Sequence, residues 1–161
     1  MTVRVEFLAS HPEEAQNLGR LHHAEWGDLY APQWSLEEAI AELEDHALRR
    51  DLPTTLVAME EDRLIGSVAL IEDELPHDVS PELRTLGPWL ASLYVLPERR
   101  GRGLGKRLVA AVEAFAQTQG QQRLYLFTEH QEQYYLPLGW FRYRRFLHRE
   151  RPVSILQRDL P

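Results

Sequence analysis

The chain has 161 residues, a net charge of −7 and no cysteine, which excludes disulfides, thiolate metal sites and covalent cysteine intermediates. Its length is typical of one domain with a substantial core, and its acidic balance disfavours nucleic acid and favours a cationic partner. No apolar run approaches the ~20 residues of a membrane span and the N-terminus lacks the apolar core of a signal peptide, so we predict a cytoplasmic protein without membrane contact and a single domain over residues 1–161.

The first half of the chain predicts a strand, two helices and a hairpin. Each helix begins with a Ser-x-x-Glu capping box, at Ser10 and at Ser35, and Pro12 supports the first of them. In chain order we expect a strand at 3–8, a helix from Ser10 to about Trp26, a loop at 27–34, a helix from Ser35, strands at 54–59 and 64–71, and a polar loop at 72–88. A loop of that length in a compact domain indicates a function.

The second half of the chain alternates strands and helices. We expect strands at 89–96, 123–127, 141–148 and 153–158, a helix at 103–119 and a short helix near 131–136. This alternation predicts an α+β or α/β fold, with helices on both faces of the sheet.

Arg100-x-x-Gly103-x-Gly105 joins the apolar strand at 89–96 to the helix that follows it. Glycine lets a ligand approach the backbone closely, and the first turn of a helix offers unpaired N–H groups at the positive end of its dipole. The motif therefore predicts a diphosphate site.

Two common glycine motifs do not fit this loop. A dinucleotide fingerprint counted from Gly101 requires glycine where Lys106 stands. A phosphate-binding NTPase loop requires glycine at Arg100 and Ser or Thr at Arg107. The pattern Arg/Gln-x-x-Gly-x-Gly/Ala after a strand instead resembles the acyl-CoA loop of the GCN5-related N-acetyltransferases (GNAT).

Two blocks of sequence carry this resemblance. Residues 94–103 are similar to the family's "V-x-P-x-x-R-G-x-G" core, and residues 134–140, Tyr-Tyr-Leu-Pro-Leu-Gly-Trp, are similar to its "Y-x-x-x-G-F" segment, with Trp140 for Phe. The resemblance implies a mixed, mostly antiparallel central sheet that is splayed between the strands at 89–96 and 123–127. It also implies acetyl-CoA as the cofactor.

The resemblance assigns the cofactor to the central strand, the glycine loop and the C-terminal block. Thr128 departs from the Asn that many members carry there, and its single hydroxyl replaces an amide's donor and acceptor. The implied cofactor-binding residues are Leu93, Tyr94, Val95, Arg100, Gly101, Arg102, Gly103, Leu104, Gly105, Lys106, Thr128 and Tyr135.

The implied activity is direct transfer of an acetyl group from acetyl-CoA to a primary amine, which is a small amine, amino acid, polyamine, antibiotic or peptide N-terminus. An alkylamine has a pKa near ~10.4, so the site must remove a proton, and it must also protonate the leaving thiolate. Tyr135 takes the place of the family's tyrosine and is our candidate acid, with Tyr134 as the fallback. Tyr135 could instead only pack.

The general base has no candidate on the central strand, where Trp89, Ala91 and Ser92 stand at positions that carry Glu or His in relatives. Two clusters lie elsewhere: His22 and Glu25 on the first helix, and Glu72, Asp73, Glu74, His77 and Asp78 in the long loop. From these we take Glu25, Glu72 and His77 as candidates, with solvent-facing polar groups as the simpler interpretation. His22 and Glu25 lack a convincing third ligand, so no metal is expected.

Aromatic side chains surround the expected acceptor region and would hold an alkylammonium by cation–π attraction, although they could equally be ordinary packing. They are Trp26, Tyr30, Trp34 and Trp89. The arginine-rich segment 142–151 suits a solvated or interface-forming hairpin better than contact with CoA phosphates, and a homodimer paired through these late strands would suit it.

Two alternatives to an enzyme stay open. One is a non-catalytic acyl-CoA-binding or sensing domain, which the missing base on the central strand favours and Tyr135 disfavours. The other is a structural module whose arginine-glycine turn binds a protein or nucleic acid, which fits the acidic balance poorly.

Overall fold

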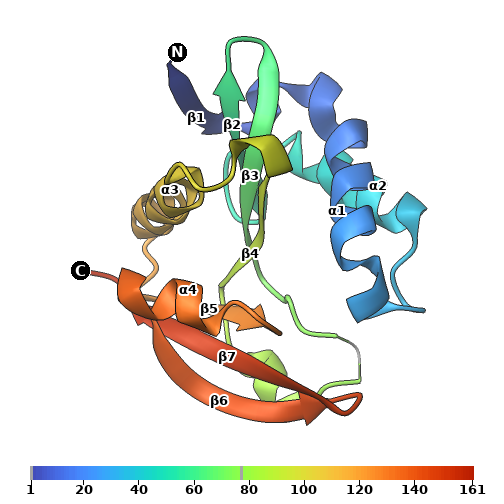
Figure 1. The fold of residues 1–161 in the computed structure, drawn as a ribbon, viewed down its shortest axis with the longest axis vertical. Coiled ribbons are helices and arrows are strands. Elements are labelled where there is room, and N and C mark those ends of the chain that lie inside the picture. The colour runs from blue at the N-terminus through green and yellow to red at the C-terminus, as the bar shows by residue number, and fades with distance from the viewer. Residues whose placement is uncertain (1, 77) are drawn as a thin grey trace.

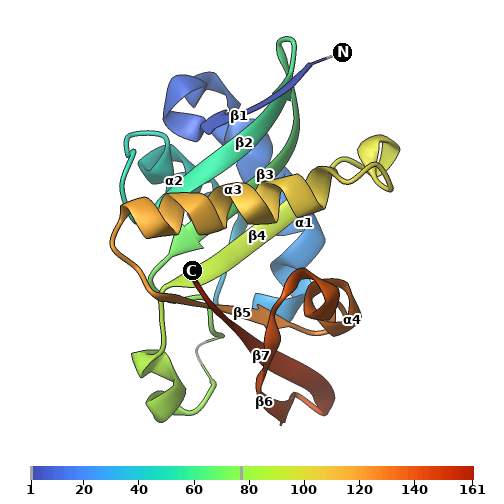
Figure 2. The same ribbon diagram turned by 90° about the vertical axis from the view of Figure 1, so that its left-hand side faces the viewer.

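A computed structural model describes residues 2–76 and 78–161. Seven strands form one sheet in the order β1-β2-β3-β4-β5-β7-β6. The elements are β1 (Val3–Phe7), α1 (Ala15–Tyr30), α2 (Leu36–His46), β2 (Thr54–Glu60), β3 (Arg63–Ile71), β4 (Trp89–Val95), α3 (Leu104–Thr118), β5 (Arg123–Thr128), α4 (Glu132–Tyr135), β6 (Phe141–His148) and β7 (Arg151–Asp159). The helices α1 and α2 cover one face of the sheet and α3 covers the other (Figures 1 and 2).

The sheet divides at its centre. Every neighbouring pair of strands is antiparallel except β4 and β5, which are parallel and whose pairing is through Trp89 and Tyr125. Beyond that contact the two strands diverge (Figure 1). The predicted mixed, mostly antiparallel sheet with its splay and two helical layers is confirmed.

The helix α3 buries its apolar face, which includes Leu104, Leu108 and Val112, against β3 and β4. Gly66 on β3 permits the close approach, because a Cβ there would lie 2.9 Å from the carbonyl oxygen of Tyr94 and 3.1 Å from Leu108 Cδ1. This packing fixes the N-terminus of α3 beside the end of β4.

The helices α1 and α2 pack on each other through Gly19, where a Cβ would lie 2.8 Å from the Cα of Ile40. The predicted capping box of α2 is present, with the Glu38 N–H donating to Ser35 Oγ at 3.1 Å and the Ser35 N–H donating to Glu38 Oε1 at 3.3 Å. The described helices include none that is long and apolar enough to cross a bilayer.

The predicted bounds of α1 are wrong at both ends. Short 3-10 turns occupy Leu8–Ser10 and Pro12–Glu14, and the α-helix begins at Ala15 and continues to Tyr30 rather than ending near Trp26. It stops before Pro32, because a residue that precedes proline is pushed into an extended conformation, which Ala31 adopts with ψ 147°. The extra turn carries Tyr30, whose hydroxyl contacts Glu74 of the long loop.

Candidate active site

A β-bulge interrupts the central strand β4. Ala91 is opposite Ala69 and Tyr94 is opposite Ser67, so β4 has one more residue than β3 between these pairs. Ser92 lies in this interval with φ at +54°, in the left-handed region that residues other than glycine rarely adopt. The bulge therefore changes which backbone groups of β4 face its open edge.

After the bulge, alternation along the strand assigns the direction of each amide. The Leu96 N–H donates to Ile65 on β3 at 3.0 Å, so the groups of Val95 point away from β3. In agreement, the Val95 carbonyl accepts from Arg100 Nε at 2.8 Å. From this we infer that Val95, and Leu93 at the end of the bulge, present their N–H groups to the gap between β4 and β5.

A groove of about 490 Å³ runs from this gap over the glycine loop to the N-terminus of α3. Gly101 and Gly103 have φ values of +76° and +80°, so the turn depends on glycine at both positions. The first N–H groups of α3 have no partner within the helix, and they face a site where Lys106 adds positive charge. Such a helix N-terminus suits a phosphate group.

Ten of the twelve predicted cofactor-binding residues line this groove, and two do not. The ten are Leu93, Tyr94, Val95, Arg100, Gly101, Gly103, Leu104, Gly105, Lys106 and Tyr135. Arg102 is an exposed loop residue outside the lining, and Thr128 lies in the neighbouring cavity, where its Oγ1 accepts the Gln131 N–H at 2.9 Å. The contact of Thr128 is thus with the turn that leads into α4.

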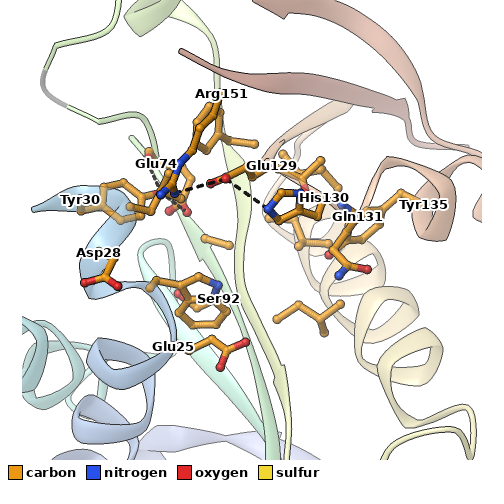
Figure 3. A pocket seen from close by; sticks show the side chains of 18 residues that line it. Glu25, Asp28, Tyr30, Glu74, Ser92, Glu129, His130, Gln131, Tyr135 and Arg151 are labelled. Atoms are coloured by element: carbon orange, nitrogen blue, oxygen red, sulfur yellow. Dashed lines mark hydrogen bonds and ion pairs between the residues drawn. The ribbon is translucent and has the colours of Figure 1, made fainter. Parts of the chain in front are cut away.

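A second cavity, of about 380 Å³, fills the splay between β4 and β5 (Figure 3). Five residues line both this cavity and the groove, so the two spaces meet in the splay: Glu25, Trp26, Leu93, Gln131 and Tyr135. The carboxylates that line the cavity are Glu25, Asp28, Glu74 and Glu129. Glu129 is paired with His130 at 3.1 Å and Arg151 at 3.3 Å. Glu25 and Asp28 give the cavity an acidic character, which suits a cation, and Glu74 adds to it when it is ionised.

Glu74 is the most strongly perturbed of these carboxylates. The Tyr30 hydroxyl donates to Glu74 Oε1 at 2.7 Å and lies 2.9 Å from its backbone carbonyl oxygen. Burial raises the pKa of Glu74 to about 8, the hydrogen bond from Tyr30 opposes this rise, and the charges of Glu42 and Asp73 add to it. A carboxylate with such a pKa is a much stronger base than an exposed one.

The model of the acetyltransferase (GNAT) family matches residues 18–139. The chain belongs to this family. The match spans most of α1, all of α2, the bulged strand, the glycine loop and α4. The family and the enzyme class predicted from the sequence are therefore confirmed.

Solved structures with the same fold include other GNAT enzymes. An aminoglycoside 6'-acetyltransferase type Ii aligns with a TM-score of 0.73 and 21% identity over 100% of this chain and 98% of its own. An aminoglycoside 6'-N-acetyltransferase complexed with coenzyme A aligns with a TM-score of 0.75 and 19% identity over 100% of this chain and 98% of its own. The PaiA N-acetyltransferase from Thermoplasma acidophilum in complex with coenzyme A aligns with a TM-score of 0.66 and 20% identity over 99% of both chains. No curated protein sequence matches.

The three predicted base candidates of this GNAT protein have different positions. Glu25 is exposed and lines both the groove and the cavity, whereas Glu72 is exposed and lines neither. His77 lies outside the described residues. Glu74, two residues after Glu72 in the same acidic loop, is the loop carboxylate that enters the cavity.

Tyr135, the candidate acid, is 7% exposed and lines both spaces. Burial raises its pKa well above the ordinary value, and the charges of Tyr134 and Glu74 add to the rise, so the phenol stays protonated. Figure 3 shows Tyr30 and Glu74 on the α1 side of the cavity and Tyr135 on the α4 side. Tyr134 is 40% exposed, and its hydroxyl lies over Gly105, where a Cβ would be 2.5 Å away.

Three of the four predicted aromatic acceptor residues surround the site. Trp26 and Tyr30 line the second cavity, and with Trp34 they line a smaller adjoining one of about 210 Å³. The prediction for Trp89 is wrong: its side chain is 0% exposed, its Nε1–H donates to the Leu86 carbonyl at 3.0 Å, and it packs on Tyr125. Trp89 is buried in a cluster with Ala69 of β3, Tyr125 of β5 and Leu83 of the long loop.

The arginine-rich segment forms the β6–β7 hairpin, with β6 at the edge of the sheet. None of its arginines lines the groove among the described residues, and Arg151 lines the second cavity, where it pairs with Glu129.

Proposed function

We propose that this protein transfers an acetyl group from acetyl-CoA directly to a primary amine. One observation carries the proposal: a groove built on the N-terminus of α3 and an acidic cavity built on α1 and the long loop meet in the splay at Leu93 and Tyr135. A diphosphate suits the first space and an ammonium group suits the second. A thioester carbonyl at the junction would be in reach of both.

The open edge of β4 supports the acyl group in this proposal. The N–H groups of Leu93 and Val95 face the gap, and the negative charge that develops on the carbonyl oxygen during transfer would be stabilised by such donors. Donors fixed in a strand need no reorganisation at the moment of reaction. The cofactor supplies the acetyl thioester, and the bulge supplies the direction of these donors.

Glu74 is the general base and Tyr135 the general acid in the proposed mechanism. The carboxylate of Glu74 lines the second cavity, and its pKa of about 8 allows it to take a proton from an ammonium group. The phenol of Tyr135 stays protonated and lines the junction, where it can donate to the departing thiolate. Glu25 at the same junction is the alternative base, and Glu72 lies outside both spaces.

The acceptor is a primary amine bearing a positive charge, and its finer class stays a prediction. Small amines, polyamines, amino acids, aminoglycoside-like antibiotics and peptide N-termini all satisfy an acidic, aromatic cavity. The aminoglycoside enzymes named above support the fold and leave the acceptor open, since their identity to this chain is 21% and 19%. A cytoplasmic location and a homodimer through the late strands likewise stay predictions.

The proposal is tested by measuring thiol release from acetyl-CoA in the presence of pooled amines and short peptides, alongside acetyl-CoA binding by calorimetry. The chain has no cysteine, so it contributes no signal to a thiol reagent. Release with one pool supports the enzyme and identifies the acceptor class. Binding without release from any pool would favour the non-catalytic acyl-CoA-binding alternative, and absence of binding would refute the proposal.

A further inference from the structure

Three polar groups from three elements meet beneath the bulge of β4. His22 of α1 and Ser67 of β3 are 1% and 0% exposed. His22 Nε2 lies 2.9 Å from Ser67 Oγ, and Ser67 Oγ donates to the Ser92 carbonyl oxygen at 3.1 Å. The chain of contacts therefore ends on the backbone of the bulge residue itself.

The hydrogen atoms in this chain can have one arrangement. A serine hydroxyl has a single hydrogen, and in Ser67 it is given to the Ser92 carbonyl. Ser67 Oγ must then accept from His22, which requires the hydrogen of His22 to be on Nε2. Burial lowers the pKa of His22 to about 3, with the charge of His46 adding to the effect, so the ring stays neutral at ordinary pH. His22 thus donates to Ser67 through Nε2 and carries no charge at ordinary pH.

The residue held by this chain has a strained backbone. Ser92 has a φ of +54°, and a serine persists in that region where its surroundings hold it. If the bulge relaxed by one residue, the alternation of β4 would shift. The amide of Tyr94 would then face the gap in place of those of Leu93 and Val95.

We propose that His22 and Ser67 are positioning residues for acetyl transfer. By holding the Ser92 carbonyl they fix the bulge, and the bulge directs the Leu93 and Val95 N–H groups toward the thioester. This inference rests on the proposed function for its kinetic consequence. His22 and Ser67 line neither the groove nor the second cavity, so their effect acts through the backbone of β4.

The surroundings of His22 decide which variants are informative. Its ring contacts Trp26 edge-on at a centroid distance of 5.1 Å and Tyr94 at 6.4 Å, and both of these line the groove. His22→Phe keeps an aromatic ring there and removes the donor. His22→Gln places an amide nitrogen near the position of Nε2 and restores the donor, while Ser67→Ala removes the link to Ser92 without touching the aromatic cluster.

His46 provides a matched control on the same face of the sheet. It is 4% exposed and its Nδ1 lies 2.8 Å from the hydroxyl of Thr55 on β2, so it repeats the buried histidine–hydroxyl contact outside the groove and the second cavity. His46→Phe should therefore lower stability as His22→Phe does, but leave kcat unchanged.

The experiment measures kcat, KM for acetyl-CoA and the pH–rate profile of these variants at a temperature where each is folded. We expect Ser67→Ala and His22→Phe to lower kcat between about 10-fold and 10²-fold, because a small displacement of the donors suffices for that. KM for acetyl-CoA should change by less than about twofold, since the α3 N-terminus still holds the diphosphate. The pH profile should keep its shape, and His22→Gln should recover most of kcat.

Wild-type kcat in Ser67→Ala would overturn the inference, and so would a loss of kcat in His46→Phe as large as that in His22→Phe. If the wild-type protein transfers no acetyl group to any amine, the proposed function fails first. The inference is then decided by a crystal structure of Ser67→Ala. Ser92 leaving the left-handed region supports it, and an unchanged bulge overturns it.

Discussion

Replacing Glu74 by Gln should remove the rise of the transfer rate that is centred near pH 8. With a pKa of about 8, roughly a tenth of Glu74 is ionised at pH 7 and about nine tenths at pH 9, so kcat/KM for the amine should rise about tenfold over this interval. The amide that Glu74→Gln introduces cannot take up the proton, but its oxygen can still accept the hydrogen bond from Tyr30. We expect the rate of this variant at pH 9 to be lower than that of the wild type by about 10²-fold. Its pH–rate profile should lack the rising limb, which is the part of the curve near pH 8 where the rate increases with pH.

Two neighbouring substitutions should move that limb in opposite directions. The hydrogen bond from Tyr30 lowers the pKa of Glu74, so Tyr30→Phe should shift the limb to higher pH. The charge of Glu42 raises the pKa of Glu74, so Glu42→Gln should shift the limb to lower pH. Neither variant removes the carboxylate, and therefore both should retain the rise that Glu74 causes, at a shifted pH.

The assay is initial-rate thiol release at saturating acetyl-CoA between pH 6 and pH 10, with the amine varied. The acceptor's own ammonium group, with a pKa near ~10.4, adds a second limb that all variants share. A limb near pH 8 that survives in Glu74→Gln would refute the assignment. If Glu25→Gln removed it instead, Glu25 would be the base.

Three further predictions concern the acid, the loop and the stability of the fold. Tyr135→Phe should lower kcat about 10²-fold and leave the Kd for acetyl-CoA by calorimetry unchanged, and unchanged turnover would exclude Tyr135 as the acid. Gly103→Ala forces a side chain into φ +80°, so thermal melts should show a loss of about 1–2 kcal/mol together with weaker acetyl-CoA binding. Gly120→Ala at φ +78°, beyond the far end of α3, should lower stability alone, and equal binding losses in both variants would contradict a role for the Gly103 turn. Folding lowers the pKa values of His22 and His46 to about 3 and about 4, so the unfolded chain takes up protons first as the pH falls below 6.5. The free energy of unfolding from urea titration should therefore fall by up to about 1.4 kcal/mol per pH unit for each histidine until those values are reached. A free energy of unfolding that is constant over this window would refute the neutral buried state.

Local sequence patterns predicted the parts of this fold that depend on local physics. The capping box at Ser35 gave the start of α2, and the apolar period of the helix after Gly103 gave α3 nearly to the residue. The groove followed from the same stretch, because glycines and a helix N-terminus are contiguous in sequence. The splay between β4 and β5 came from the family resemblance rather than from any pattern.

The remainder of the site depends on contacts between distant segments. Glu72 and Glu74 are indistinguishable in an irregular loop without periodicity, and what separates them is that Tyr30 reaches Glu74 from an extra turn of α1. Trp89 is hidden by the fold of the 72–88 loop. The bulge at Ser92 adds one residue to a strand whose side chains give no sign of it, and its support by His22 and Ser67 joins residues 45 and 25 positions apart.

The most direct test of direct transfer follows the acetyl group itself. Acetyl-CoA labelled with ¹³C in the acetyl group is incubated with the protein and the acceptor identified from the pools, and protein and amine are then examined by mass spectrometry. We predict one labelled acetyl group on the amine for each thiol released, with the mass of the protein unchanged. Thiol release without labelled amine, or a label retained on the protein, would contradict the account.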